Sequence, residues 1–171
     1  MAERVKLIAR GAALLLLVAA TAYALQQWIL KPLRCSFAAS TGGAALERVD
    51  PANYASRRLT HDFRAELSDC ECVSPPDVAI PMTRAAAAEV DGDRVAAIAE
   101  YQRALQIDRR PEIYSLLAML QDESGNHAGA IDNLTLACAF DPKRISEIPY
   151  EDIRIETERR LRATYGPDWI R

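Results

Sequence analysis

The sequence predicts an all-α protein in which one N-terminal transmembrane helix precedes a short helical solenoid. An uncharged run of twenty residues lies near the N-terminus, at positions 11–30. Further on, "GDRVAAIAEYQRALQID" (residues 92–108) and "GNHAGAIDNLTLACAFD" (residues 125–141) repeat with an offset of 33 residues. Alanine is abundant and only 6% of the residues are aromatic, a composition that favours helices over a β-sandwich.

The first segment, residues 1–34, is expected to form the membrane anchor. Its uncharged run, "GAALLLLVAATAYALQQWIL", extends from Gly11 to Leu30. At a rise of 1.5 Å per residue, such a helix crosses a hydrocarbon core of about 30 Å. Tyr23 and Trp28 lie toward one end, where amphipathic rings suit the membrane interface.

A cleavable signal peptide is the competing interpretation, because basic residues, an apolar run and the A-x-A pattern at residues 22–24 also occur in that order. The apolar character continues past Ala24 to Leu30, which favours an uncleaved single-span anchor. Within the span, Ala20 and Ala24 form a small-xxx-small pair, and Gln26 offers an amide group. These residues either pack against another transmembrane helix or simply belong to an alanine-rich anchor.

The charge distribution predicts the topology. Residues 1–34 carry five basic side chains against one acidic, a net charge of +4, whereas residues 35–171 carry 16 basic and 23 acidic side chains, a net charge of −7. On the two flanks of the span, Arg4, Lys6 and Arg10 lie on the N-terminal side against Glu3, and Lys31 and Arg34 lie on the other side, soon followed by acidic residues. By the positive-inside rule this small bias places the N-terminus in the cytoplasm and, in a bacterial inner membrane, the C-terminal domain in the periplasm. A soluble part this acidic is not expected to have the basic surface that binds phosphate backbones, so we expect no nucleic-acid binding.

Residues 35–80 are expected to form a cysteine-containing helical segment with a proline-rich connector. The four cysteines are Cys35, Cys70, Cys72 and Cys138, in neither a haem-attachment motif nor paired zinc motifs. In an exported domain, Cys35 is expected to form a disulfide with Cys70 or Cys72. The alternatives are a redox or copper site at Cys70-Glu71-Cys72, or free buried thiols.

Within this segment, a helix is predicted to begin at Asp50, a good N-cap, with Pro51 at its first position. Its apolar residues recur at four-residue spacing: Leu59, Phe63 and Leu67. The stretch "VSPPDVAIPM" (residues 73–82) has three prolines, so it is predicted to be an extended connector that continues no helix.

Residues 81–171 are expected to form the helical domain. Within each copy of the repeat, apolar and small residues fall at helical spacing: Ala97, Tyr101, Ala104 and Leu105, then Ala130, Leu134, Ala137 and Cys138. Gly92 and Gly125 occupy the points where the chain must turn sharply between helices. A helix–turn–helix unit of this length cannot bury its own apolar face, so neighbouring units must stack, with alanines where their helices approach closely.

The second copy carries a longer pattern: Tyr114, Leu117, Ala118, Gly125, Ala130, Leu134, Ala137 and Pro142. In this order it resembles the tetratricopeptide repeat family. The first copy matches in its second helix, whereas "MTRAAAAEVD" lacks the aromatic and the leucine, and Arg109 replaces the usual proline. The resemblance covers about residues 80–142, fewer than three full repeats, so stability is expected to require either caps or a partner.

Two helices are candidates for these caps. The C-terminal one carries an apolar stripe, formed by Tyr150, Ile153, Thr157, Leu161 and Tyr165. Gly166 and Pro167 are expected to end it. The helix over residues 51–67 is the candidate for the other cap.

The resemblance implies protein recognition in a groove formed by the first helices of the repeats. The matching positions are Met82, Ala86, Glu89, Glu112, Ser115, Met119, Asp122 and Glu123. An acidic groove with two methionines favours a basic or amphipathic segment of a partner. The alternative is that these carboxylates are a solvated helix face.

Nothing in the sequence indicates catalysis. His61 and His127 are isolated, and there is no glycine-rich phosphate loop, nucleophile elbow or metal motif. We therefore expect no enzyme activity, no cofactor and no small-molecule substrate. The prediction is a membrane-anchored scaffold or assembly factor for a membrane or envelope complex, acting on protein partners. The alternatives are a permanent accessory subunit of such a complex, or a thiol-redox or metal-handling protein that uses Cys70 and Cys72.

Overall fold

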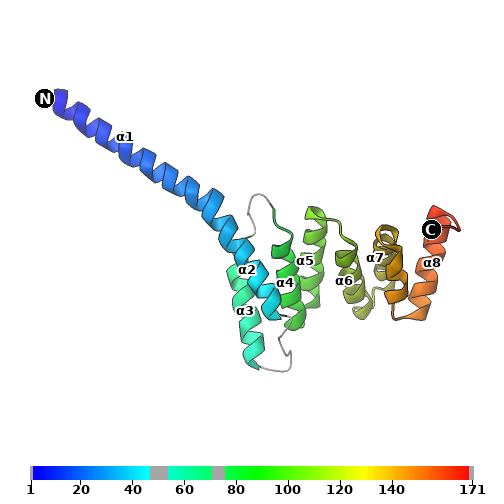
Figure 1. The fold of residues 1–171 in the computed structure, drawn as a ribbon. Helices are drawn as coiled ribbons and strands as arrows, with labels where there is room; N and C mark the ends of the chain where they lie inside the picture. Colours follow the sequence, from blue (N-terminus) through cyan, green and yellow to red (C-terminus); the bar gives the residue numbers. More distant parts are fainter. Residues whose placement is uncertain (1, 47–53, 71–75, 170–171) are drawn as a thin grey trace.

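The computed structural model describes residues 2–46, 54–70 and 76–169 (Figure 1). Within these ranges every regular element is a helix, which confirms the all-α prediction. In chain order they are α1 (Ala2–Leu25), η1 (Gln26–Leu30), α2 (Lys31–Leu46), α3 (Tyr54–Ser68), α4 (Ala79–Val90), α5 (Arg94–Ile107), α6 (Pro111–Glu123), α7 (His127–Phe140), η2 (Pro142–Glu147) and α8 (Glu151–Tyr165).

The N-terminal helix is longer than the predicted anchor. Elements α1, η1 and α2 follow one another without interruption and form one long rod, of which α1 projects from the other helices and α2 lies beside α3 and α4 (Figure 1). The helix over Ala12–Leu46 is long and apolar enough to cross a membrane, and its most apolar window is not buried. A cleavable signal sequence would meet the same criterion.

Pro32 explains the irregular turn in this rod. Proline has no N–H to donate and its ring clashes with the preceding turn, which normally kinks a helix. Directly before it, η1 is a π-helical turn, in which the Lys31 N–H donates to the Gln26 carbonyl five residues back. The extra residue in this turn lets the helix continue past Pro32 to Leu46.

Helix α2 belongs to the folded domain as well as to the rod. Its buried side consists of Cys35, Ala38, Ala39, Gly42 and Leu46, and it packs against α3 and α4. A Cβ atom on Gly42 would lie 3.2 Å from side-chain atoms of Phe63 and Thr83. Any larger residue at this position would require the neighbouring side chains to shift.

Helix α3 confirms the predicted middle helix in part. Phe63 packs beside Gly42, and Leu67 packs in a cluster with Cys35 and Cys70. The predicted start of the helix, at Asp50 and Pro51, and the Leu59 side chain lie outside the described residues. Ion pairs join this helix to the turn between α4 and α5: the Arg64 guanidinium lies 3.1 Å from carboxylate oxygens of both Asp91 and Asp93.

The predicted connector over residues 73–82 is wrong in its second half, because α4 begins at Ala79 and includes Pro81. The first N–H groups of a helix have no acceptor within it, so a proline in the first turn loses no hydrogen bond. The Asp77 carboxylate accepts from the Ala79 N–H at 2.9 Å and helps to start the helix. Residues 73–75 lie outside the described ranges.

Helices α4 to α8 stand in a row, in which each packs against the next (Figure 1). The turns after α4 and α6 are equivalent. Gly92 and Gly125 have positive φ angles of 77° and 80°. The next residues, Asp93 and Asn126, each cap the following helix by accepting a backbone N–H three residues on. The repeat in the sequence is thus a repeat in local structure.

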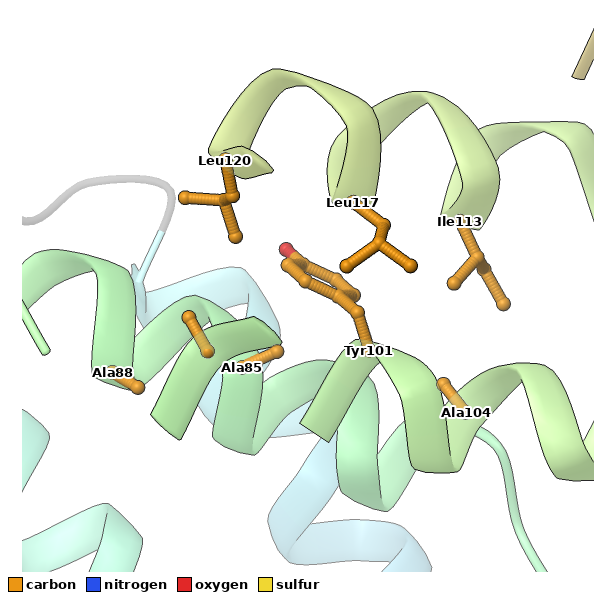
Figure 2. Packing of buried hydrophobic residues seen from close by; sticks show 8 residues of the cluster. Ala85, Ala88, Tyr101, Ala104, Ile113, Leu117 and Leu120 are labelled. Atoms are coloured by element: carbon orange, nitrogen blue, oxygen red, sulfur yellow. The ribbon is translucent and has the colours of Figure 1, made fainter. Parts of the chain in front are cut away.

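Tyr101 lies at the centre of the largest core cluster. Figure 2 shows its ring, on α5, pointing toward Leu117 and Leu120 of α6, above the small side chains of Ala85 and Ala88 on α4. The first helix of the first copy lacks the aromatic residue found in the second copy. Its alanines leave a space that the Tyr101 ring of α5 fills instead.

Helix α8 packs against α7, as its apolar stripe predicts. Ile153, Thr157 and Leu161 are buried, and Gly166 follows the helix with a φ angle of 90°. Tyr150 and Tyr165, which were predicted to belong to the stripe, are 55% and 58% exposed. They lie at the two ends of the helix, beyond the reach of α7.

Candidate partner-binding groove

A groove of about 450 Å³ lies between α6, η2 and the start of α8. Its apolar lining comes from four segments: Leu116, Ala118 and Met119 of α6, Leu134 of α7, Ile148 to Tyr150 after η2, and Ile153 of α8. Met119 and Tyr150 are 56% and 55% exposed. The groove is therefore an open apolar surface rather than a closed cavity.

Four of the eight predicted groove residues line this groove: Glu112, Ser115, Met119 and Asp122. All of them come from α6, where their spacing of three and four residues places them on one face. Their role in binding a partner stays a prediction.

The three predicted positions on α4 do not line the groove. Met82 packs against the Tyr101 cluster, Ala86 is half-buried, and the Glu89 carboxylate accepts a hydrogen bond from the Tyr101 hydroxyl. The eighth position, Glu123, is likewise outside the groove and lies 3.3 Å from Arg94 in an exposed ion pair. Partial withdrawal of the Glu89 carboxyl from water raises its pKa, and the hydrogen bond from Tyr101 opposes this effect.

The wall of the groove opposite α6 was not predicted from the sequence. Ile148, Pro149 and Tyr150 face α6 across the groove. Tyr150 and Ile153 were predicted only as part of the apolar stripe of the C-terminal capping helix. The run Ile148-Pro149-Tyr150 could have indicated this wall, because an apolar stretch between two helices is expected either to be buried in the core or to contact a partner.

The rim of the groove is acidic. Arg144 is the cation on it, with a guanidinium 2.6 Å from Glu112 and 3.5 Å from Glu147. It also lies 3.6 Å from Asp141 and is only 18% exposed, so its charge is already matched. Asp122, on the same groove, contacts His127. The carboxylates around the groove therefore outnumber the cations.

The cysteines form one disulfide, between Cys35 on α2 and Cys70 after α3. This confirms the predicted pairing of Cys35 with one of its two candidates, and Cys72 lies outside the described residues. Both half-cystines are buried, at 2% and 5% exposure. Cys138 is a buried free thiol, and burial raises its pKa to about 11, so it stays protonated at neutral pH.

The remaining candidates are dispersed. In the described ranges, His, Cys, Asp and Glu form no group of three that could hold a metal ion. His61 is exposed on α3, beside Asp62. Ala20 and Ala24 are exposed on α1, and Gln26 lines a second cavity, beside Cys35.

The fold and the groove together define an all-helical protein with one candidate membrane span and an open apolar groove. No family model, curated protein or solved structure matches this chain. The tetratricopeptide resemblance therefore stays a prediction, based on the residues quoted above.

Proposed function

We propose that this protein is a membrane-anchored interaction module of a membrane or envelope complex, and that the groove between α6 and α8 binds a segment of a partner protein. The observation that carries this proposal is the groove itself, an apolar lining of about 450 Å³ with an acidic rim. The role is that of a scaffold or assembly factor.

The chemistry of the groove favours an amphipathic, basic helix or peptide. Apolar side chains of the partner would fill the space beside Met119 and Ile148, and lysine or arginine side chains would pair with the carboxylates of Glu112, Asp122 and Glu147. The flexible Met119 side chain can adapt to partners of different shape.

Exposed side chains after residue 24 support an uncleaved anchor. Trp28, Ile29, Leu30 and Leu33 are 71%, 50%, 54% and 63% exposed. Cleavage after Ala24 would leave these four in water at the start of the mature protein, a contiguous apolar patch that soluble proteins avoid. A transmembrane helix instead places them in or beside the bilayer.

The Cys35–Cys70 disulfide supports a location outside the cytoplasm, since structural disulfides persist in oxidising compartments. The charge bias of the N-terminal residues points the same way. We therefore propose a single-pass inner-membrane protein, with a cytoplasmic N-terminus and α2 to α8 in the periplasm.

The helix pairs α4–α5 and α6–α7 would be two tetratricopeptide-like units, with α3 and α8 as caps. The equivalent turns at Gly92 and Gly125 and the equivalent caps at Asp93 and Asn126 support this assignment. The groove would then be the concave surface formed by the first helix of the second unit and by α8.

Site-specific photo-crosslinking tests the proposal in cells. A photoreactive amino acid at Met119 is expected to capture one partner through a segment rich in lysine or arginine. The control position is Val95, which is 81% exposed on α5 and lies outside the groove. Equal capture at both positions, or capture of an acidic segment, would refute the groove assignment.

A permanent accessory subunit is the second candidate. The continuity of α1, η1 and α2 favours it, because a rigid helix fixes how the domain is oriented relative to the membrane. Co-purification in mild detergent separates the two roles, since a subunit stays with its complex in a fixed stoichiometry and an assembly factor does not.

A further inference from the structure

A second cavity, of about 650 Å³, lies where the candidate span meets the folded domain. One side of it is the rod, from Ala22 to Ala38, and the other side is the C-terminal end of α3, from Glu66 to Cys70. This cavity is separate from the groove and shares no lining residue with it.

The polarity of the cavity changes along the rod. Ala22, Leu25 and Leu30 give the uncharged part of the lining its apolar side chains, and the amides of Gln26 and Gln27 lie between them. Lys31 and Arg34 follow directly, and Leu30 lies about 12 Å beyond Ala22 along the helix axis. A membrane that covers the uncharged run therefore has its headgroups at the level of these two cations.

Two carboxylates belong to the other side of the cavity, one at the end of α3 and one directly after it. Glu66 and Asp69 both line the cavity, and the Glu66 carboxylate lies 3.8 Å from the Arg34 guanidinium. These two side chains are 78% (Arg34) and 44% (Glu66) exposed, so their ion pair is weak and can open for a ligand. The polar end thus offers two positive and two negative groups.

The disulfide holds these charges opposite one another. Arg34 directly precedes Cys35, and Asp69 directly precedes Cys70. The Cys35–Cys70 bond therefore joins the cationic turn of α2 to the acidic end of α3, and both half-cystines line the cavity.

We propose that this cavity binds one phospholipid whose headgroup carries a primary ammonium as well as a phosphate. The phosphate pairs with Lys31 and Arg34, the ammonium pairs with Glu66 and Asp69, and an acyl chain lies along the apolar part. This proposal depends on the membrane insertion proposed above and not on the groove.

The charge pattern distinguishes this lipid from other occupants of the cavity. An anionic lipid without an ammonium group would leave both carboxylates beside its phosphate. A transmembrane helix of a partner would set apolar side chains against four charged groups. The zwitterionic headgroup is the one that matches both pairs.

Native mass spectrometry of the full chain tests the proposal. The protein is reconstituted in nanodiscs of equal parts phosphatidylethanolamine and phosphatidylglycerol, and the lipids that remain bound after extraction are identified. The wild type is expected to retain one phosphatidylethanolamine, with a preference over phosphatidylglycerol of about tenfold, the ratio for a charge-assisted hydrogen bond. The double variant Glu66→Gln/Asp69→Asn is expected to lose this preference, and Arg34→Gln to weaken retention of both lipids.

The matched control is Arg94→Gln/Glu123→Gln, which removes an exposed ion pair far from the membrane helix. It should retain lipid like the wild type, and circular dichroism should show equal helix content in all variants. Equal retention of the two lipids by the wild type, or an equal loss of preference in the control, would overturn the proposal. So would a photoreactive group at Leu25 that captures protein and no lipid.

Membrane insertion is measured on the same samples by resistance to alkaline carbonate extraction. Failure to insert would overturn both the lipid site and the proposed anchored function. Insertion without lipid preference would overturn the lipid site alone.

Discussion

The Thr83 hydroxyl on α4 donates a buried hydrogen bond of 2.9 Å to the backbone carbonyl of Ala39 on α2. This bond joins the first helix of the repeat region to the continuation of the candidate span. With the Cys35–Cys70 disulfide and the close approach at Gly42, it makes the rod part of the domain's core. Helix α2 is therefore fixed within the folded domain.

The close approach at Gly42 predicts that a substitution there destabilises the protein, whereas a substitution at the neighbouring Gly43 does not. Gly42→Leu would drive a side chain into Phe63 and Thr83 and should lower the free energy of unfolding by about 1–3 kcal/mol. Gly43→Ala is the control, since its Cβ would lie 3.7 Å from Thr83, and it should stabilise the helix by up to ~1 kcal/mol. Thermal unfolding in detergent, followed by circular dichroism, measures both. Equal shifts would contradict the packing of α2 against α3 and α4.

The disulfide predicts a redox-dependent stability. Its half-cystines are 35 residues apart, and the double variant Cys35→Ser/Cys70→Ser should lose about 2–4 kcal/mol of stability. Dithiothreitol should lower the melting temperature of the wild type and leave that of the double variant unchanged. The variant Cys138→Ala, which lacks only the buried free thiol, should keep the response to dithiothreitol. An unchanged wild type under reducing conditions would contradict the prediction.

The repeat predicts different effects at a buried and an exposed position. Ala130 is fully buried on α7, so Ala130→Leu should overpack the helix interface and cost about 1–3 kcal/mol of stability. Glu123→Ala removes a carboxylate that is 51% exposed and should change stability little. Chemical denaturation of both variants is the measurement. Similar losses would mean that the faces of these helices are misassigned.

Asp93 predicts an acid-dependent loss of stability. Its carboxylate accepts from the Ala96 N–H and pairs with Arg64, and both contacts lower its pKa. A lowered pKa in the folded state stabilises the protein above the unfolded pKa of about 3.9, and this contribution is lost as the pH falls through the folded value.

Asp93→Asn keeps a side-chain acceptor for the cap and removes the ion pair with Arg64. Its stability should therefore fall less steeply below about pH 4 than that of the wild type. Asp62→Asn, on the exposed side of α3, is the control. Unfolding curves between pH 2 and pH 7 that are parallel for the wild type and Asp93→Asn would contradict the prediction.

The size of the groove predicts that the anchor matters for binding. A groove lined by thirteen residues supports a contact at the low end of specific interfaces, below about 1,200 Å². Confinement to the membrane beside the partner would compensate by raising the effective concentration. Replacing residues 11–25 with an unrelated transmembrane helix should therefore preserve crosslinking from position 119. Loss of crosslinking in a correctly inserted chimera would mean that the native span contacts the partner, as in the accessory-subunit interpretation.

Local features of the sequence were sufficient to predict most of the helices. The turns at Gly92 and Gly125 and the close helix approach at Ala97 and Ala130 were predicted from the 33-residue repeat, and the structure has positive φ angles at these glycines and buries these alanines. These features depend on interactions over a few residues, for which periodicity is informative. The helical start at Ala79 was missed because three nearby prolines suggested an extended chain, although a first turn tolerates proline.

The sequence by itself determined the helical fold class and the apolar N-terminal helix, because each is encoded in one continuous stretch. Tertiary structure alone decided that Cys35 pairs with Cys70, that α2 packs into the domain beyond Pro32, and that Ile148 to Tyr150 close the groove opposite α6. Each of these outcomes depends on which distant surfaces meet. Such contacts are selected by the fit of side chains across helices, as at Gly42 and Tyr101, and leave no periodic signal along the chain.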